Sequence, residues 1–232
     1  MIGSVARLTR FPVKSTAGEH ITSTLVDARG LVHDRGWAAY TADGGIASGK
    51  TTRRFRRVDG MMLWRSTISA DDVLLHAPDG TGYSVLDPAA SAALSSALGQ
   101  PLELRPETNI AHHDASGVHL LTTSSLRAAA DIGDAEPDHR RFRANIVIDT
   151  DGTGFVEDGW VGAVLAIGSE VTIRVGAGMQ RCVMIDRPQA DVTPKAPLLR
   201  ALGRYHDTAF GAEAEVLTPG RIAEGDPVRL VR

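Results

Sequence analysis

Residues 140–149 read RRFRANIVID, and this stretch carries the clearest strand pattern in the chain. Successive side chains of a strand point to opposite faces, so a strand here has one apolar and one polar face. The apolar face holds Phe142, Ala144, Ile146 and Ile148. The other face holds Arg141, Arg143 and Asn145, with Val147 among them. Two readings stay open for this polar face: a donor array for phosphate or a heterocycle, or the solvated side of an edge strand.

Short apolar segments of this kind recur along the chain, separated by Gly, Pro, Asp and Asn. Such spacing is typical of sheets and barrels. We predict strands at residues 4–9, 22–26, 37–40, 61–65, 73–76, 102–105, 144–149, 164–167, 170–175 and 227–231. Helical periodicity predicts helices only at residues 88–98, 123–132 and 197–204. The first of these has Asp87 as its N-cap, Pro88 at its first position and Gly99 after its end.

The predicted fold class is therefore α+β and predominantly β. The first helix ends at Gly99, and turn residues follow as far as residue 113. We place the division of the chain there, which gives two closely packed β-rich halves at residues 1–98 and 99–232. The join has no long Gly/Ser-rich or Pro-rich tract that would act as a flexible linker.

Composition excludes several classes of function. The 25 basic and 28 acidic residues give a net charge of −3, so a general nucleic-acid-binding surface is not expected. A single cysteine cannot form an intramolecular disulfide or a Cys-rich metal site. The chain has neither a signal-peptide pattern nor an apolar run near the roughly 20 residues of a membrane span. We therefore expect a cytoplasmic protein without a membrane span that acts on small molecules.

Basic side chains lie in motifs that suit an anion. Lys14 and Ser15 follow the bend at Pro12, and Asp34 can orient the guanidinium of Arg35. Residues 50–57 form a further basic segment. Local positive charge in a slightly acidic chain favours selective anion capture. Each motif could equally be a solvated loop or a surface ion pair of small energy.

The lone cysteine, Cys182, lies in the stretch QRCV at residues 180–183. The neighbouring Arg181 favours the thiolate, which is the nucleophilic and metal-binding form. The alternative is an inert core cysteine. No nucleophile elbow, Walker A loop or Rossmann glycine pattern is present. The run of His112, His113 and Asp114 is a poor metal site, because adjacent residues seldom converge on one ion.

Five motifs taken together resemble the MOSC family, the molybdenum cofactor sulfurase C-terminal domain proteins. They are FPVKS at 11–15, HDRGW at 33–37, RRFRAN at 140–145, QRCV at 180–183 and GRIAEGDPVRL at 220–230. The likeness extends over about residues 3–231, and it is strongest to the branch that carries an N-terminal MOSC β-barrel half. This branch includes the amidoxime-reducing components and their bacterial counterparts.

The resemblance implies a β-barrel-like MOSC domain packed against an N-terminal half, with molybdopterin held in the cleft between them. Cys182 matches the residue that ligates molybdenum, so the resemblance makes it both the catalytic residue and the metal ligand. The cofactor-binding positions carry over to Lys14, Ser15, Arg35, Ser116, Arg143 and Asn145. A soft thiolate suits molybdenum, and flat donors suit a pterin ring.

The chain also departs from the family pattern. Phe11 replaces the usual Tyr, and the usual Arg-Gln pair becomes Gly49 and Lys50. After Cys182, the usual Thr-Thr-Val-Asp-Pro run is replaced by residues that begin with Met184. These differences lie beside the expected substrate cleft, so they affect the substrate prediction more than the cofactor prediction.

The function expected from the resemblance is a molybdenum cofactor-dependent oxidoreductase that reduces N-hydroxylated, amidoxime-like or N-oxide-like substrates. The chain has no haem, flavin or iron–sulfur signature, so a separate reductase would supply the electrons. Asp186 and His206 are candidate proton donors. Two alternatives stay open: a sulfur carrier or sulfurtransferase with a persulfide on Cys182, and a cofactor-binding protein without catalysis.

Overall fold

The computed structural model describes residues 1–133, 138–192 and 197–231, and strands dominate it. The strands are β1 (Gly3–Arg10), β2 (Glu19–Ile21), β3 (Ser23–Asp27), β4 (Gly30–Leu31), β5 (Trp37–Thr41), β6 (Ile46–Ser48), β7 (Phe55–Arg57), β8 (Arg65–Ser69), β9 (Asp72–His76), β10 (Gly82–Ser84), β11 (Leu102–Pro106), β12 (Val118–Thr122), β13 (Ile146–Asp149), β14 (Val164–Ile167), β15 (Val171–Gln180), β16 (Ala209–Thr218), β17 (Gly220–Ala223) and β18 (Pro227–Val231). The helices are α1 (Pro88–Leu98), α2 (Thr123–Gly133) and α3 (Leu198–Tyr205). Short 3-10 turns are η1 (Met61–Leu63), η2 (His139–Phe142), η3 (Val156–Trp160) and η4 (Val183–Asp186).

A closed barrel forms the larger half of the molecule. Its strands run in the order β13-β12-β16-β15-β14-β18-β1, and β1 pairs back onto β13 to close a seven-stranded ring. The pair β12–β13 is parallel, whereas the other pairs in the ring are antiparallel. Closure leaves the barrel without a free edge. The predicted β-rich fold class is thus confirmed.

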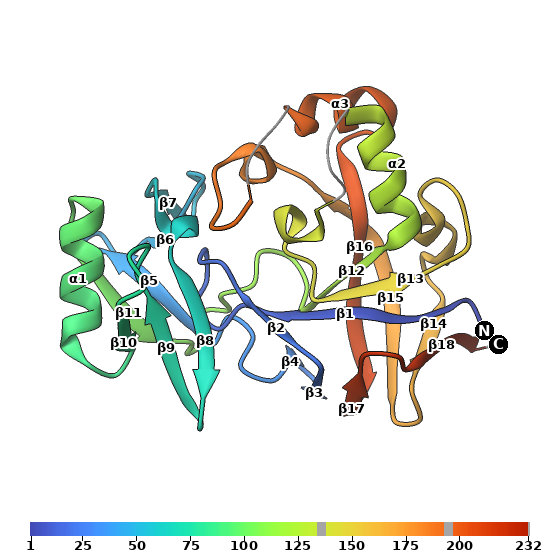
Figure 1. Ribbon diagram of the computed structural model, residues 1–232, viewed down its shortest axis with the longest axis horizontal. Coiled ribbons are helices and arrows are strands. Elements are labelled where there is room, and N and C mark those ends of the chain that lie inside the picture. The colour runs from blue at the N-terminus through green and yellow to red at the C-terminus, as the bar shows by residue number, and fades with distance from the viewer. Residues whose placement is uncertain (134–137, 193–196, 232) are drawn as a thin grey trace.

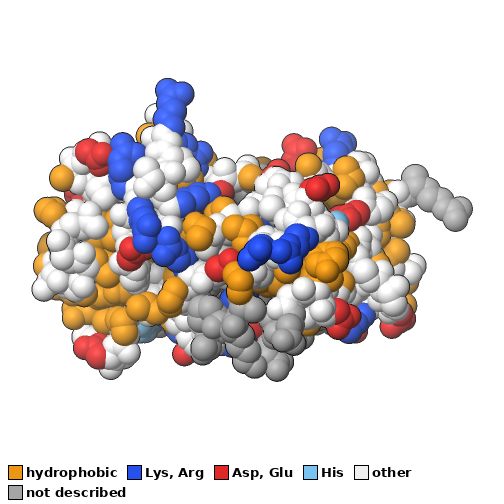
Figure 2. Space-filling view, turned by 90° about the horizontal axis from the view of Figure 1, so that it is seen from above, with side chains coloured by type: hydrophobic (Ala, Val, Ile, Leu, Met, Phe, Trp, Pro, Cys, Tyr) orange, Lys and Arg blue, Asp and Glu red, His pale blue; other side chains and the backbone are white. Residues whose placement is uncertain are grey.

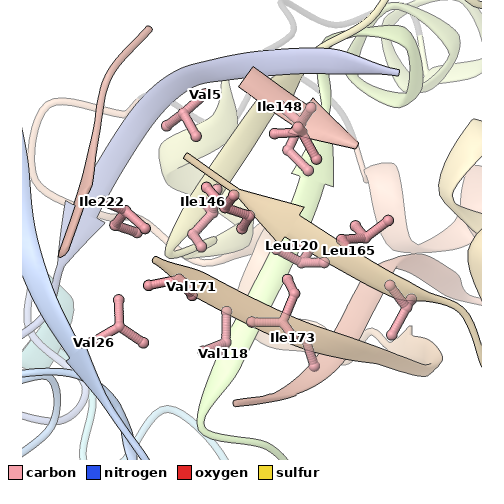
Figure 3. Close-up of a cluster of buried hydrophobic side chains, with 14 of the residues drawn as sticks. Val5, Val26, Val118, Leu120, Ile146, Ile148, Leu165, Val171, Ile173 and Ile222 are labelled. Atoms are coloured by element: carbon pink, nitrogen blue, oxygen red, sulfur yellow. The ribbon is translucent and has the colours of Figure 1, made fainter. Parts of the chain in front are cut away.

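Alternating apolar side chains fill the barrel (Figure 3). Val118 and Leu120 of β12 point into the same cluster as Ile146 and Ile148 of β13. This is the period of two that places every second strand residue on the inner face. Helices α2 and α3 pack on each other and cover a second cluster outside the barrel wall (Figure 1).

The N-terminal part is built from smaller sheets. One has the order β11-β5-β6-β7 and another has the order β10-β9-β8 (Figure 1). Helix α1 lies along their outer side and buries Ala90 and Leu94 against a core around Trp64. The start and end of α1 agree with the prediction. Asp87 Oδ1 accepts a hydrogen bond from the amide of Ala89, and Gly99 ends the helix in the left-handed region at φ 70°.

The chain crosses between the two parts more than once. Strand β1 is a barrel strand, although the sequence that follows it enters the N-terminal part. Strand β17, which follows the barrel strand β16, pairs with β3. These exchanges bring the loop after β1 against the segments that precede β5 and β13. The boundary at residues 98 and 99 stays a prediction.

Two predicted strands need correction. Residues 61–65 begin as η1 (Met61–Leu63), and β8 starts only at Arg65, because Gly60 turns the chain at φ 92°. The strand predicted at 144–149 starts at Ile146. Before it, η2 is capped by Asp138, and Arg143 adopts a left-handed conformation at φ 58°.

The polar strand face predicted for residues 141–145 therefore does not exist. Arg141, Arg143 and Asn145 precede the strand and lie in different environments. Arg141 is buried, and its Nη1 donates to the carbonyl of Ile185. The barrel strands β12 and β16 lie in stretches for which the sequence predicts no strand.

Candidate functional site

One cavity of about 260 Å³ lies between the two parts of the molecule. All seven residues predicted for the site line this cavity: Lys14, Ser15, Arg35, Ser116, Arg143, Asn145 and Cys182. They come from five separate segments of the chain, so only the tertiary fold brings them together. Their roles toward a cofactor stay predictions.

Lys14 and Ser15 lie in a tightly anchored loop after β1. The amide of Lys14 donates to the carbonyl of Trp37 at 2.8 Å, and the amide of Val13 donates to Ser66 Oγ at 3.0 Å. Lys14 is buried, and its Nζ lies 2.7 Å from Asp114 Oδ1. Burial lowers the pKa of Lys14 to about 8, although the charge of Asp114 opposes the shift. The ammonium group is therefore costly to keep without an anion beside it.

Arg35 is oriented by a buried carboxylate, as the sequence predicts. Its Nη1 donates to Asp34 Oδ2, and Asp34 Oδ1 accepts from the amide of Phe11 at 2.8 Å. Burial alone would raise the pKa of Asp34, but the charge of Arg35 and a hydrogen bond with His113 lower it to about 2. Asp34 thus stays ionised and fixes the guanidinium in the cavity wall.

Arg143 and Asn145 line the cavity, but their side chains also bond to the backbone. Arg143 Nη1 donates to the carbonyl of Thr16 at 2.6 Å. Asn145 Nδ2 donates to the carbonyl of Thr9 at 3.3 Å, and its Oδ1 accepts from the amide of His119 at 3.2 Å. Asn145 therefore links β1, β12 and the start of β13 and holds the wall in place.

Two phenylalanine rings support the cations. The ring of Phe11 has the guanidinium carbons of Arg143 and Arg35 at 4.3 and 4.9 Å from its centroid. The ring of Phe55 has the ammonium groups of Lys14 and Lys50 at 4.7 and 5.1 Å. Cation–π attraction offsets part of the repulsion between the paired cations. Phe11, which stands where the family usually has Tyr, thus serves as one of these platforms.

Three of the predicted residues adopt left-handed backbone conformations. The φ angles are 65° for Ser15, 52° for Arg35 and 58° for Arg143. Residues other than glycine adopt this region at a cost of order 1 kcal/mol each. Such conformations concentrate where a fold aims side chains or amides at a ligand. The surrounding hydrogen bonds maintain them here.

Cys182 follows β15 at the start of η4, and its side chain is a partly exposed free thiol. The preceding Arg181 also lines the cavity, and its Nη2 donates to the carbonyl of Phe142 at 2.6 Å. Burial lowers the pKa of Arg181 to about 10, while the charge of Cys182 opposes this shift. The thiol is therefore reachable from the cavity and has a cation next to it.

The cavity also holds residues that the sequence did not identify as site residues. Among them are Ser48, Lys50, Asp114, His119, Arg181 and Glu213. The basic segment at 50–57 was a signal for Lys50; it follows β6 and ends in β7. Figure 2 shows Lys and Arg side chains gathered on one face of the molecule. His119 gave no signal, because it sits among apolar residues of an unpredicted strand.

His119 is buried, and its Nε2 has no hydrogen-bond partner among the described residues. Burial, together with the charges of Arg181 and Arg35, lowers its pKa well below the usual value, so the ring is neutral. Nε of Arg181 is likewise buried and without a partner in the described part of the chain. The cavity wall thus contains polar groups whose hydrogen bonding within the protein is incomplete.

The two candidate proton donors lie elsewhere. Asp186 caps α3, because its Oδ1 accepts from the amide of Leu198 at 2.9 Å. His206 stacks on Phe155 at 3.8 Å and pairs with Asp158 outside the cavity. Neither residue lines the cavity. Their assignment as proton donors at the site was therefore wrong.

Comparison with known families agrees with this architecture. The model for the MOSC domain matches residues 107–229. The model for the MOSC N-terminal beta barrel domain matches residues 2–112. The chain belongs to the MOSC family. Membership supports a function related to the molybdenum cofactor, which MOSC domains bind or sulfurate.

The chain is also similar to solved structures at low sequence identity. The YuaD protein from Bacillus subtilis matches with a TM-score of 0.54 and 13% identity, over 98% of this chain and 94% of that one. YiiM from Geobacillus stearothermophilus matches with a TM-score of 0.38 and 18% identity, over 50% of this chain and 54% of that one. Comparison with curated proteins gives no match. No helix in the described residues is long and apolar enough to span a membrane.

Proposed function

We propose that this MOSC protein is a molybdenum cofactor-dependent oxidoreductase that reduces N-hydroxylated, amidoxime-like or N-oxide-like substrates. One observation carries the proposal: a reachable thiol, Cys182, shares a cavity with the cations Lys14, Arg35 and Arg143. A phosphorylated pterin with a thiolate-bound metal needs this combination of a soft ligand and anion-binding groups. A purely structural cysteine does not.

The residues present fit the cofactor. Lys14, Ser15, Arg35 and Ser116 would hold its phosphate, because their two cationic groups and two hydroxyls line the same cavity. Arg143 would face the pterin ring, with Asn145 holding that wall in position. Cys182 would be the protein ligand of molybdenum.

When bound, the cofactor supplies two-electron chemistry at molybdenum. The protein contributes binding and electrostatics. Asp34 fixes the guanidinium of Arg35 in position, and the rings of Phe11 and Phe55 support the cations. His119 is neutral, so its ring adds no positive charge to a strongly cationic wall. Electrons would come from a separate reductase, because the chain carries no haem, flavin or iron–sulfur motif.

The direct test is the metal and pterin content of the full chain purified from a host that makes the cofactor. The expected result is near-stoichiometric molybdenum and pterin, with benzamidoxime reduction when a chemical electron donor is supplied. Cys182→Ser should lose most of the activity, and Asp59→Asn, a change outside the cavity, should keep it. Full activity in Cys182→Ser would overturn the ligand role.

The same preparation separates the two alternatives. A sulfur carrier would show the mass of one extra sulfur atom on Cys182 and contain no molybdenum. The partly exposed thiol beside Arg181 is the observation that keeps this alternative open. A non-catalytic binding protein would contain molybdenum and pterin but reduce no N-hydroxylated compound. Either result would replace the oxidoreductase proposal.

A further inference from the structure

The carboxylate of Asp114 lies between two lysine ammonium groups in the cavity. Its Oδ1 is 2.7 Å from Nζ of Lys14, and its Oδ2 is 3.1 Å from Nζ of Lys50. Both ammonium groups lie over the ring of Phe55. Two cations on one aromatic platform therefore share a single internal anion.

The three partners differ in how much water they can reach. The side chain of Lys14 is 6% exposed, that of Lys50 is 22% exposed and that of Asp114 is 46% exposed. A buried ammonium has lost its hydration and requires an anionic partner. A half-exposed carboxylate loses little when it turns toward water. Asp114 is therefore the partner that can move, and Lys14 is the partner that must stay paired.

A phosphate at Lys14 would compete with Asp114 for the same ammonium. Two anions close together on one cation repel each other, and the repulsion is stronger in a cavity than in water. Lys50 offers Asp114 another position, because it already bonds to the second carboxylate oxygen. Arg54 also ties the two segments together, since its Nη2 donates to the carbonyl of His113 at 2.5 Å.

We propose that Asp114 is an internal stand-in for the ligand's phosphate and that Lys50 is its alternate partner. In the empty cavity Asp114 bridges Lys14 and Lys50. When a phosphate monoester binds, the phosphate takes Lys14 and Asp114 remains on Lys50 alone. Asp114 and Lys50 are thus positioning residues that keep an anion beside the buried ammonium group of Lys14 until the ligand arrives. This inference rests on the proposed phosphate site.

The test is calorimetric titration of the full chain, purified from a host that cannot make the cofactor, with inorganic phosphate. Asp114→Asn removes the competing charge, so phosphate should bind about tenfold more tightly. Lys50→Gln removes the alternate partner, so phosphate should bind about fivefold more weakly. In the Asp114→Asn background, Lys50→Gln should change the affinity for phosphate by less than about twofold, because there is no longer a carboxylate for Lys50 to hold.

Controls identify the source of any change. Asp59→Asn removes an exposed carboxylate that pairs with Arg57 outside the cavity, and it should leave phosphate affinity unchanged. Asp114→Ser serves as a second removal of the carboxylate if Asp114→Asn melts at a lower temperature than the native chain.

Two results would overturn the exchange while leaving the phosphate site intact. If the affinity for phosphate does not rise in Asp114→Asn and Asp114→Ser, Asp114 does not compete with phosphate for the ammonium group of Lys14. An equal loss from Lys50→Gln in both backgrounds means that Lys50 contacts phosphate itself. If Lys14→Gln binds phosphate as well as the native chain, or if no form binds it, the proposed phosphate site fails and the exchange fails with it.

Discussion

The Cα of Gly49 faces the thioether of Met184 so closely that a Cβ on Gly49 would lie 2.3 Å from Sδ. Gly49 follows β6 in the N-terminal part, and Met184 lies in η4, two residues after Cys182. The contact therefore connects the N-terminal part to the turn that positions the proposed metal ligand. Gly49 stands where the family usually has Arg, and Met184 fills the space beside it.

Gly49→Ala should lower the free energy of unfolding by about 1–2 kcal/mol, because the new methyl group displaces the end of Met184. In a Met184→Ala background the same change should cost less than half as much, since the neighbour is gone. Urea denaturation of the four chains measures both values. Gly159→Ala is the control, because a Cβ there meets no atom within 4 Å. Equal costs in the two backgrounds would contradict the contact.

Local signals predicted the parts of the fold that depend on local chemistry. The helix Pro88–Leu98 was predictable because Asp87 caps it, Pro88 suits its first turn and Gly99 can adopt a positive φ. The seven residues predicted for the site could be named because short motifs carry them, and their roles stay predictions. That they line one cavity could not be read from composition or periodicity, because they come from five segments that lie far apart in the sequence.

The errors in the predicted strands have physical causes. Strand β16 reads AFGAEAEVLT, and Ala and Glu favour helix, yet β12 and β15 flank the segment and impose a strand. Residues 140–145 alternate like a strand, but the alternation says nothing about φ. Asp138 caps a 3-10 turn there, and Arg143 takes a left-handed φ. Phe142 and Ala144 are buried as predicted, although both precede the strand and do not belong to it.

The aromatic platform under the lysines gives a second prediction. Phe55→Met keeps most of the buried volume but removes the ring beneath Lys14, Lys50 and Arg54. Loss of a desolvated cation–π contact costs about 1–2 kcal/mol, so phosphate should bind the cofactor-free chain roughly fivefold to thirtyfold more weakly. Calorimetry measures the affinity, and thermal melting shows that the fold persists. Native affinity in Phe55→Met would mean that the ring has no part in anion binding.

Gly211 gives a third prediction, at the wall behind His119. Its φ is 73°, and a Cβ there would lie 2.5 Å from His119 Nε2 and 2.5 Å from the carbonyl oxygen of Leu120. Gly211→Ala should therefore destabilise the chain by about 2 kcal/mol or more and shift the NMR signals of the His119 ring. Gly80→Ala is the matched control, because Gly80 has φ 90° but open space around it. It should cost only the backbone strain, about 1 kcal/mol. Similar costs for the two changes would show that the clash is absent.

The pair of His206 and Asp158 gives the last prediction, on the pH dependence of stability. Burial lowers the pKa of His206, but the carbonyl of Ala209 and the carboxylate of Asp158, 2.6 Å away, outweigh burial and raise it above 6.5. A raised pKa in the folded state means that protonation stabilises the fold. This contribution is complete below pH 6.5 and disappears as the pH rises through the folded-state pKa.

Asp158→Asn should therefore lower the free energy of unfolding by up to about 1 kcal/mol at pH 5.5 and by only a few tenths at pH 8.5, because both side chains are partly exposed. Urea denaturation at the two pH values measures the difference. Asp71→Asn removes an exposed carboxylate in a left-handed turn that Asn also accepts, and its effect should be the same at both pH values. A loss from Asp158→Asn that does not shrink at pH 8.5 would show that the charge of His206 takes no part in holding η3 against the end of α3.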